Sequence, residues 1–233
     1  TGEGSFYEII PYGLMLVLFG AAFLFGLVAL YKGVKTFWKE TAAKPDEMWR
    51  IANHVQAIKD TLTLRYLDGN GEGCNYPDDR FSMIRRKFHH ATFYGFMACV
   101  VSTAIAFIYD HIFGWPAPYE FFSLPVLFGT GGGIALCIGT GGLMYLKCKM
   151  DRRPYDEASI SMDVSFAMLL FLICLTGLLL MLLHTTALMG LLLCIHLGLV
   201  LGLFVTFSTS KFAHIAYRYF ALVRNAYEMR DSN

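Results

Sequence analysis

Charged residues are scarce in this 233-residue chain, because Asp, Glu, Lys and Arg make up only 16% of it while 56% is hydrophobic. An average soluble domain carries roughly 25% charged residues, so the composition excludes an ordinary soluble fold. The 19 basic and 18 acidic residues nearly cancel, which excludes the strongly basic surface of a nucleic-acid-binding protein. The closest two of the six cysteines, Cys137 and Cys148, lie eleven residues apart, so the chain also lacks the CxxC spacing of zinc and iron–sulfur sites.

Long uncharged runs take the place of the missing charges and predict an all-α integral membrane bundle of five helices. The first run, 12–31, would be about 30 Å long as a helix, which matches the hydrocarbon core of a bilayer. No Asp, Glu, Lys or Arg occurs in 164–210, which would extend about 70 Å as one helix and must therefore fold back on itself. The five predicted spans are 12–31, 91–109, 121–146, 164–184 and 188–210.

The basic residues predict how these spans are oriented. Eleven Lys or Arg lie in 32–88, four in 147–162 and four after residue 210, whereas 111–120 and 184–187 contain none. Basic segments of multi-pass proteins stay on the cytoplasmic side. We therefore expect the N-terminus outside and the C-terminus in the cytoplasm.

Three parts of the chain follow from this topology. Residues 1–31 form an outer N-terminal segment and the first span, 32–88 a cytoplasmic loop, and 89–233 a four-span bundle with a cytoplasmic tail. Within the loop, the apolar periodicity over 46–67 predicts an amphipathic helix along the cytoplasmic face, with His54 in solvent. The Gly-rich segment 69–79 breaks this periodicity and is either a partner-contacting loop or a cap on the bundle.

Histidine is the residue type that points to chemistry, because ionisable residues in membrane spans are costly and are often functional. His196 and His214 are eighteen residues apart, so on one continuous helix their rings leave the same side about 27 Å apart. His89 or His90 begins the second span and His111 ends it. Because these two spans run antiparallel, we expect His89 or His90 to meet His214 near the cytoplasm and His111 to approach His196 on the outer side. Paired imidazoles from facing helices predict one or two b-type haems.

Basic residues flank the cytoplasmic pair. Arg85 and Arg86 precede His89, and Lys211 and Arg218 bracket His214, where cations would neutralise haem propionates. The alternative is that these residues only anchor the cytoplasmic ends of the spans.

A structural role for the histidines is the competing interpretation. Polar side chains also form hydrogen bonds between membrane helices, as in a non-redox transporter or an assembly anchor. The glycines of 129–142 indicate close helix packing rather than a nucleotide loop, because no strand precedes them and no P-loop lysine follows.

Several motifs of the chain resemble the membrane part of the tricarballylate-utilization protein B family, and more distantly the five-span cytochrome b subunit of respiratory nitrate reductase, whose last helix carries two ligand histidines at like spacing. The resemblance covers most of residues 6–227 and lies in the Gly-rich loop 69–77, Arg85–Phe96, Gly114–Tyr119, Ser123–Leu127, Met189–Gly198 and Lys211–His214.

The resemblance implies a multi-pass electron carrier of the bacterial inner (cytoplasmic) membrane. It would be an electron-transfer subunit of an oxidoreductase system that reoxidises a flavin-dependent tricarballylate dehydrogenase and reduces quinone. The family carries iron–sulfur clusters in a Cys-rich segment ahead of the spans, so we expect an iron–sulfur donor only in an upstream segment or a partner. The resemblance favours His89 over His90 as a ligand, carries over well to His196 and His214, and includes His111 less closely.

Overall fold

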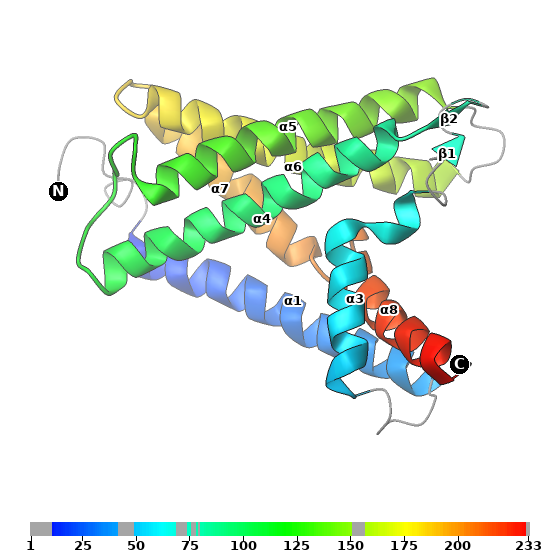
Figure 1. The fold of residues 1–233 in the computed structure, drawn as a ribbon. Coiled ribbons are helices and arrows are strands. Elements are labelled where there is room, and N and C mark those ends of the chain that lie inside the picture. Colours follow the sequence, from blue (N-terminus) through cyan, green and yellow to red (C-terminus); the bar gives the residue numbers. More distant parts are fainter. Residues whose placement is uncertain are drawn as a thin grey trace.

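The computed structural model describes residues 11–41, 49–68, 74–75, 78, 80–150 and 157–231. It is an α-helical bundle with one small antiparallel strand pair (Figure 1). The elements are α1 (Tyr12–Glu40), α3 (Ile51–Thr63), η2 (Arg65–Leu67), β1 (Cys74–Asn75), β2 (Phe81–Ser82), α4 (Ile84–His111), α5 (Leu124–Lys149), α6 (Glu157–Leu183), α7 (Met189–Thr206), η4 (Lys211–Ala213) and α8 (His214–Asp231).

Five of these helices, α1, α4, α5, α6 and α7, are long and apolar enough to cross a membrane, which confirms the predicted number of spans. Four of them are longer than a bilayer requires, and α1 and α4 are the longest. At 1.5 Å per residue, the 29 residues of α1 and the 28 of α4 extend about 43 Å and 42 Å, against a hydrocarbon core of about 30 Å. Both helices therefore project beyond the hydrocarbon core.

Helices α4 and α5 pack with their backbones in contact. A Cβ atom built on Gly139 would lie 2.5 Å from the Thr92 nitrogen, and one on Gly132 would lie 2.8 Å from the Gly95 oxygen. Neither position has room for a methyl group. The glycines of α5 thus serve close helix packing, as the sequence predicts.

The remaining spans pack around this pair. Helix α6 lies against α5, α7 against α6, and α1 against α7 (Figure 1). The α1–α7 contact includes aromatic side chains, with the rings of Phe23 and Phe204 5.5 Å apart. The ends of α1 and α5 and the starts of α4 and η4 carry Lys39, Lys147, Arg85 and Lys211, and we call this end of the bundle the basic end.

The last predicted span is broken, which corrects the geometry expected for His196 and His214. Helix α7 ends at Thr206, and α8 begins as a separate helix at His214. Hydroxyl groups around the break bond to the backbone: Thr206 Oγ1 donates to the Gly202 carbonyl at 2.8 Å, and Ser210 Oγ accepts from the Phe212 nitrogen at 3.3 Å. Such bonds compete with helical hydrogen bonding. Because His196 lies in α7 and His214 begins α8, the two histidines do not share one helical face.

Helix α3 lies across the basic end and packs on α8 around Ala57, Leu222 and Val223 (Figure 1). The expectation that His54 lies in solvent is wrong. Its Nδ1 is 2.8 Å from the Tyr219 hydroxyl, and its Nε2 is buried. Of the Gly-rich segment 69–79, the structure describes only residues 74, 75 and 78, so its predicted contact with a partner lies mostly outside the described residues.

Candidate functional site

His89 lies in the second turn of α4, on a different side of the helix from the residues that meet α5. The α5 glycines are contacted instead by Phe88, which precedes His89, and by Thr92, one helical turn after Phe88. The His89 Nδ1 is buried and has no hydrogen-bond partner within the described part of the chain. A buried polar atom without a partner is costly, so this nitrogen is open to a hydrogen bond or to coordination by a bound group.

The groups that interact electrostatically with His89 come from the start of α8 and from α4 itself: they are His214, Arg218 and Arg85. The structure therefore brings His89 and His214 to the same end of the bundle, although 125 positions (214 − 89) separate them in the chain. The sequence predicts that His89 or His90 meets His214 near the cytoplasm; in the structure His214 begins a separate helix instead of continuing one long span.

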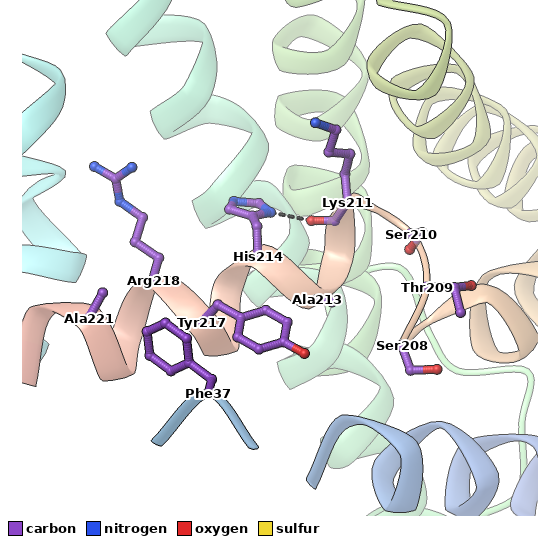
Figure 2. A pocket seen from close by; sticks show the side chains of 10 residues that line it. All are labelled: Phe37, Ser208, Thr209, Ser210, Lys211, Ala213, His214, Tyr217, Arg218 and Ala221. Carbon is purple, nitrogen blue, oxygen red and sulfur yellow. Dashed lines mark hydrogen bonds between the residues drawn. The ribbon is translucent and has the colours of Figure 1, made fainter. Parts of the chain in front are cut away.

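His214 points one ring nitrogen at its own backbone. Its Nδ1 contacts the Lys211 carbonyl oxygen, which only accepts hydrogen bonds, so Nδ1 carries the proton in the neutral ring. The lone pair of a neutral ring then lies on Nε2, the nitrogen through which histidines commonly bind metals. Figure 2 shows His214 and Arg218 on one side of α8, with Tyr217 on the other side toward Phe37 of α1.

A cavity of about 560 Å³ opens at the break between α7 and α8. This volume is within the roughly 300–1,000 Å³ of ligand pockets. Its polar lining comes from three consecutive hydroxyls and from side chains of η4 and α8, and its apolar side is Phe37 of α1 (Figure 2). The polar residues are Ser208, Thr209, Ser210, Lys211, His214, Tyr217 and Arg218.

Lys211 and Arg86, which the sequence singles out among the basic residues, are both engaged in other contacts. Lys211 pairs with Asp163 at 3.0 Å, and the same carboxylate pairs with Lys147 at 2.8 Å. Arg86 donates from Nη2 to the Thr63 carbonyl at 2.8 Å, which ties α4 to the end of α3. The cations that reach His89 are Arg85 and Arg218.

His196 is held in the interface between α6 and α7. Its Nδ1 is 3.0 Å from Thr176 Oγ1, and its ring lies against Gly177, where a Cβ would be 3.2 Å from Cε1. The Thr176 hydroxyl already donates its only proton to the Leu172 carbonyl at 2.7 Å. While that proton is donated to Leu172, the hydroxyl accepts from His196 Nδ1, and the Nε2 lone pair is left for a metal. A hydrogen bond that fixes the tautomer in this way is typical of ligating histidines.

His111 and His90 have different surroundings. The His111 ring stacks on the Phe107 ring, with the centroids 4.2 Å apart. Its Nδ1 is 3.2 Å from the Phe107 carbonyl oxygen and 3.5 Å from the Asp110 carboxylate. The His111 ring thus lies at the end of its own helix, and His196 lies in the α6–α7 interface. The His90 ring lies 5.9 Å from that of Tyr94. Within the described residues, no group of three or more His, Cys, Asp and Glu side chains is arranged to hold a bare metal ion.

Sequence reasoning missed two parts of this site. Thr176 was not singled out as the partner of His196, because its role depends on the packing of α6 against α7. The hydroxyls of 208–210 were interpreted as the end of a span. A run of Ser-Thr-Ser at the end of an apolar segment was the available signal for a helix break and a polar cavity.

Comparison with known proteins gives two matches. The family model described as "Citrate utilization protein B" matches residues 1–233. A curated relative, "Citrate utilization protein B" of Escherichia coli, is 45% identical over 228 residues, which is 97% of this chain and 59% of the relative. The chain thus spans about three-fifths of the length of that relative. No solved structure matches the chain.

Proposed function

Because the chain belongs to the citrate utilization protein B family, we propose that it is a membrane b-type cytochrome of a tricarboxylate-utilization system. It carries electrons from a flavin-dependent dehydrogenase of tricarballylate, citrate or a related tricarboxylate to the quinone pool. The observation that carries this proposal is the placement of His89 and His214 at the same end of the bundle, with the His89 Nδ1 buried and unpartnered among the described residues and with His214 lining a cavity.

These residues fit haem b at the basic end. His89 from α4 and His214 from α8 would hold the haem iron through their ring nitrogens. Bound haem supplies a reversible one-electron couple, and the protein contributes binding, orientation and electrostatics. The Lys211 carbonyl holds the tautomer of His214, and the close contact of α4 with α5 fixes the helix that carries His89.

The charges around the pair support the same assignment. Arg218 and Arg85 are the cations near His89, and the hydroxyls of Ser208, Thr209 and Ser210 line the cavity. Arginine and hydroxyl groups bind carboxylates such as haem propionates. Lys211 would contribute less to the propionates than the sequence suggests, because Asp163 already neutralises it.

A second haem is proposed on His196, whose tautomer leaves Nε2 available. His111 remains its predicted partner from the second span. This ligand pair has weaker support than the first, because the two rings lie in different surroundings.

The proposed setting is the bacterial inner membrane, with the basic end and the C-terminus in the cytoplasm and the N-terminus outside. The positive-inside rule supports this orientation. The electron donor would be an iron–sulfur protein or segment, which the segment 69–79 would contact. Since the chain covers 59% of its relative, the donor clusters are assigned to sequence outside these 233 residues or to a partner.

The competing proposal of a transporter or assembly anchor has less support. Transporters place ionisable or interrupted segments near the middle of the membrane. The acidic residues in the five spanning helices, Glu40, Asp110, Glu157 and Asp163, lie near helix ends. The histidines are thus the polar groups that such a function would have to use.

The test is the haem content of the purified full chain, measured by absorption spectroscopy and by a haem-to-protein ratio. The wild-type chain should show reducible b-type bands, and His89→Ala and His214→Ala should each lose the haem of the basic end. His184→Ala is the matched control, because His184 also lies at a helix end, with Nδ1 2.8 Å from the Met181 carbonyl. A colourless wild-type preparation made with ample haem, or full haem content in both variants, would contradict the proposal.

A further inference from the structure

Helix α3 exposes an apolar stripe outside the five spans. The exposed fractions are 81% for Ile51, 59% for Val55, 47% for Ile58 and 45% for Leu62. The spacing of four, three and four residues places these side chains on one side of the helix, and we call this set the α3 stripe. A helix that belongs to a soluble surface has the reverse arrangement, with its apolar side inward.

The opposite side of α3 is the buried one. Asn53, Ala57 and Asp60 are at most 4% exposed, and Ala57 packs against Leu222 and Val223 of α8. Helix α8 therefore covers the polar and small side chains of α3. The α3 stripe faces away from that contact.

The contacts of α3 place its C-terminal end at the edge of the bilayer. The Leu62 carbonyl accepts a 2.6 Å hydrogen bond from the Tyr94 hydroxyl, and the Thr63 carbonyl accepts one from Arg86. Tyr94 is ten residues into α4, or about 15 Å along it. Because α4 exceeds the hydrocarbon thickness by only about 12 Å in total, Tyr94 lies within the membrane part of that helix.

The other end of α3 lies farther from the membrane. Trp49, just before the helix, packs against Trp38 with the ring centroids 5.5 Å apart. Trp38 is in the last turn of α1, which at 29 residues extends well beyond the hydrocarbon core. Helix α3 thus slopes from outside the core at Ile51 to its edge at Leu62.

The surroundings of the α3 stripe match those of a membrane surface. Aromatic side chains at the two ends, Trp49 and Tyr66, are 59% and 49% exposed, as in the aromatic belts at membrane–water interfaces. Basic side chains next to the stripe, among them Lys59 and Arg65, are exposed. On α4, Tyr94 continues the exposed surface from Leu62 into the lipid-facing part of the bundle.

We propose that the α3 stripe binds phospholipid, with α3 lying in the interface of the leaflet at the basic end and its Leu62 end inserted deepest. Interfacial amphipathic helices bury their apolar side about 5–10 Å into the boundary between headgroups and acyl chains. A soluble partner domain is a poorer occupant, because it would have to enter the bilayer to cover Leu62 beside Tyr94.

The first test uses a photo-crosslinking amino acid at Ile58 or Leu62 of the full chain in nanodiscs of phosphatidylethanolamine and phosphatidylglycerol. Lys59, on the same helix but beside the stripe, is the matched control position. We expect the intact mass to increase by one phospholipid several-fold more often at Ile58 and Leu62 than at Lys59. Equal lipid adducts at all three positions, or none at Ile58 and Leu62, would overturn the proposal.

A second test measures depth without crosslinking. Spin labels are placed at Ile51, Val55, Ile58 and Leu62 in turn, after Ser replaces Cys74, Cys148 and Cys194. Accessibility to oxygen relative to a water-soluble nickel chelate should rise from Ile51 to Leu62. Higher chelate accessibility at all four sites would indicate water, and protection from both reagents would indicate a protein partner; either result refutes lipid binding. Neither readout depends on haem, so this proposal and the proposed function fail independently.

Discussion

The two sides of α4 differ in how closely they are packed. Toward α5, the backbones of Gly95 and Gly132 are so near that a methyl group on either would meet backbone atoms within 2.8 Å. Toward α8, His89 has an unpartnered buried nitrogen within the described residues, and His214 lines a cavity of about 560 Å³. Helix α4 thus packs without free space on α5, and it carries a buried histidine at the end of the bundle where η4 and α8 line a cavity.

This difference indicates a division of labour within the bundle. The α4–α5 contact holds the histidine-bearing helix at one depth and rotation, because small residues let two membrane helices approach closely. The break between α7 and α8 supplies the space and the second histidine. A well-ordered binding site needs both a rigid support and room for the ligand.

The largest expected effect tests the side of α4 that packs against α5. Gly132→Ala should destabilise the protein by about 3 kcal/mol, because the methyl group would lie 2.8 Å from the Gly95 oxygen and 2.9 Å from the Ala98 Cβ. Gly131→Ala is the control on the same helix, since nothing described lies within 4 Å of its Cβ position. It should be neutral or gain up to about 1 kcal/mol in helix propensity. Thermal unfolding in detergent distinguishes the two variants, and equal midpoints would contradict the packing.

The next effect concerns His196. Thr176→Val should weaken haem binding at that histidine about 10–100-fold, because it removes the acceptor that orients the ring. Thr176→Ser should restore binding, since it keeps the hydroxyl. Thr140→Val serves as control, because Thr140 is also buried and, within the described residues, its hydroxyl bonds to its own helix at Leu136 and Cys137. Haem titration of the apoprotein is the measurement; unchanged affinity in Thr176→Val would remove His196 from the ligand set.

A smaller effect is expected for the ion pairs that Asp163 forms with Lys147 and Lys211. Asp163→Asn should destabilise the bundle by about 1 kcal/mol, because it leaves the Lys147 and Lys211 ammonium groups without their shared carboxylate. Glu228→Gln breaks an exposed pair with Arg224 within α8 and should cost only about 0.3 kcal/mol. Unfolding at low and high salt measures both, and an equal loss in the two variants would show that the three-residue network adds nothing.

The smallest effect concerns the support of α8 by α3. Tyr219→Phe removes the hydroxyl 2.8 Å from His54 Nδ1 and should cost about 0.5–1 kcal/mol. Tyr145→Phe is the control, because Tyr145 is 60% exposed. Limited proteolysis near residue 50 should become faster in Tyr219→Phe alone. No change in cleavage would indicate that the packing around Ala57 holds α3 without this hydrogen bond.

Much of the fold follows from sequence because each span is recognised by its own composition. The predicted run 12–31 became α1, and the turn after 109 occurs where Gly114 adopts φ +66°, a conformation that favours glycine. The break at Thr206 was not predicted, because hydropathy is insensitive to hydroxyl groups that bond to the backbone within an apolar run. His54 was placed in solvent for a related reason, since its partner Tyr219 is 165 residues away.

The sequence alone determined that this is a five-span α-helical membrane protein with histidines within its spans and at their ends, because the length of an uncharged run is measured directly against the bilayer. It also determined that the glycines of α5 pack against a neighbour. Only the tertiary structure decided that His214 starts a separate helix beside His89, that Thr176 orients His196, and that α3 turns its apolar side outward. These features depend on which distant side chains meet, and contacts between distant residues leave no periodic signal in a single sequence.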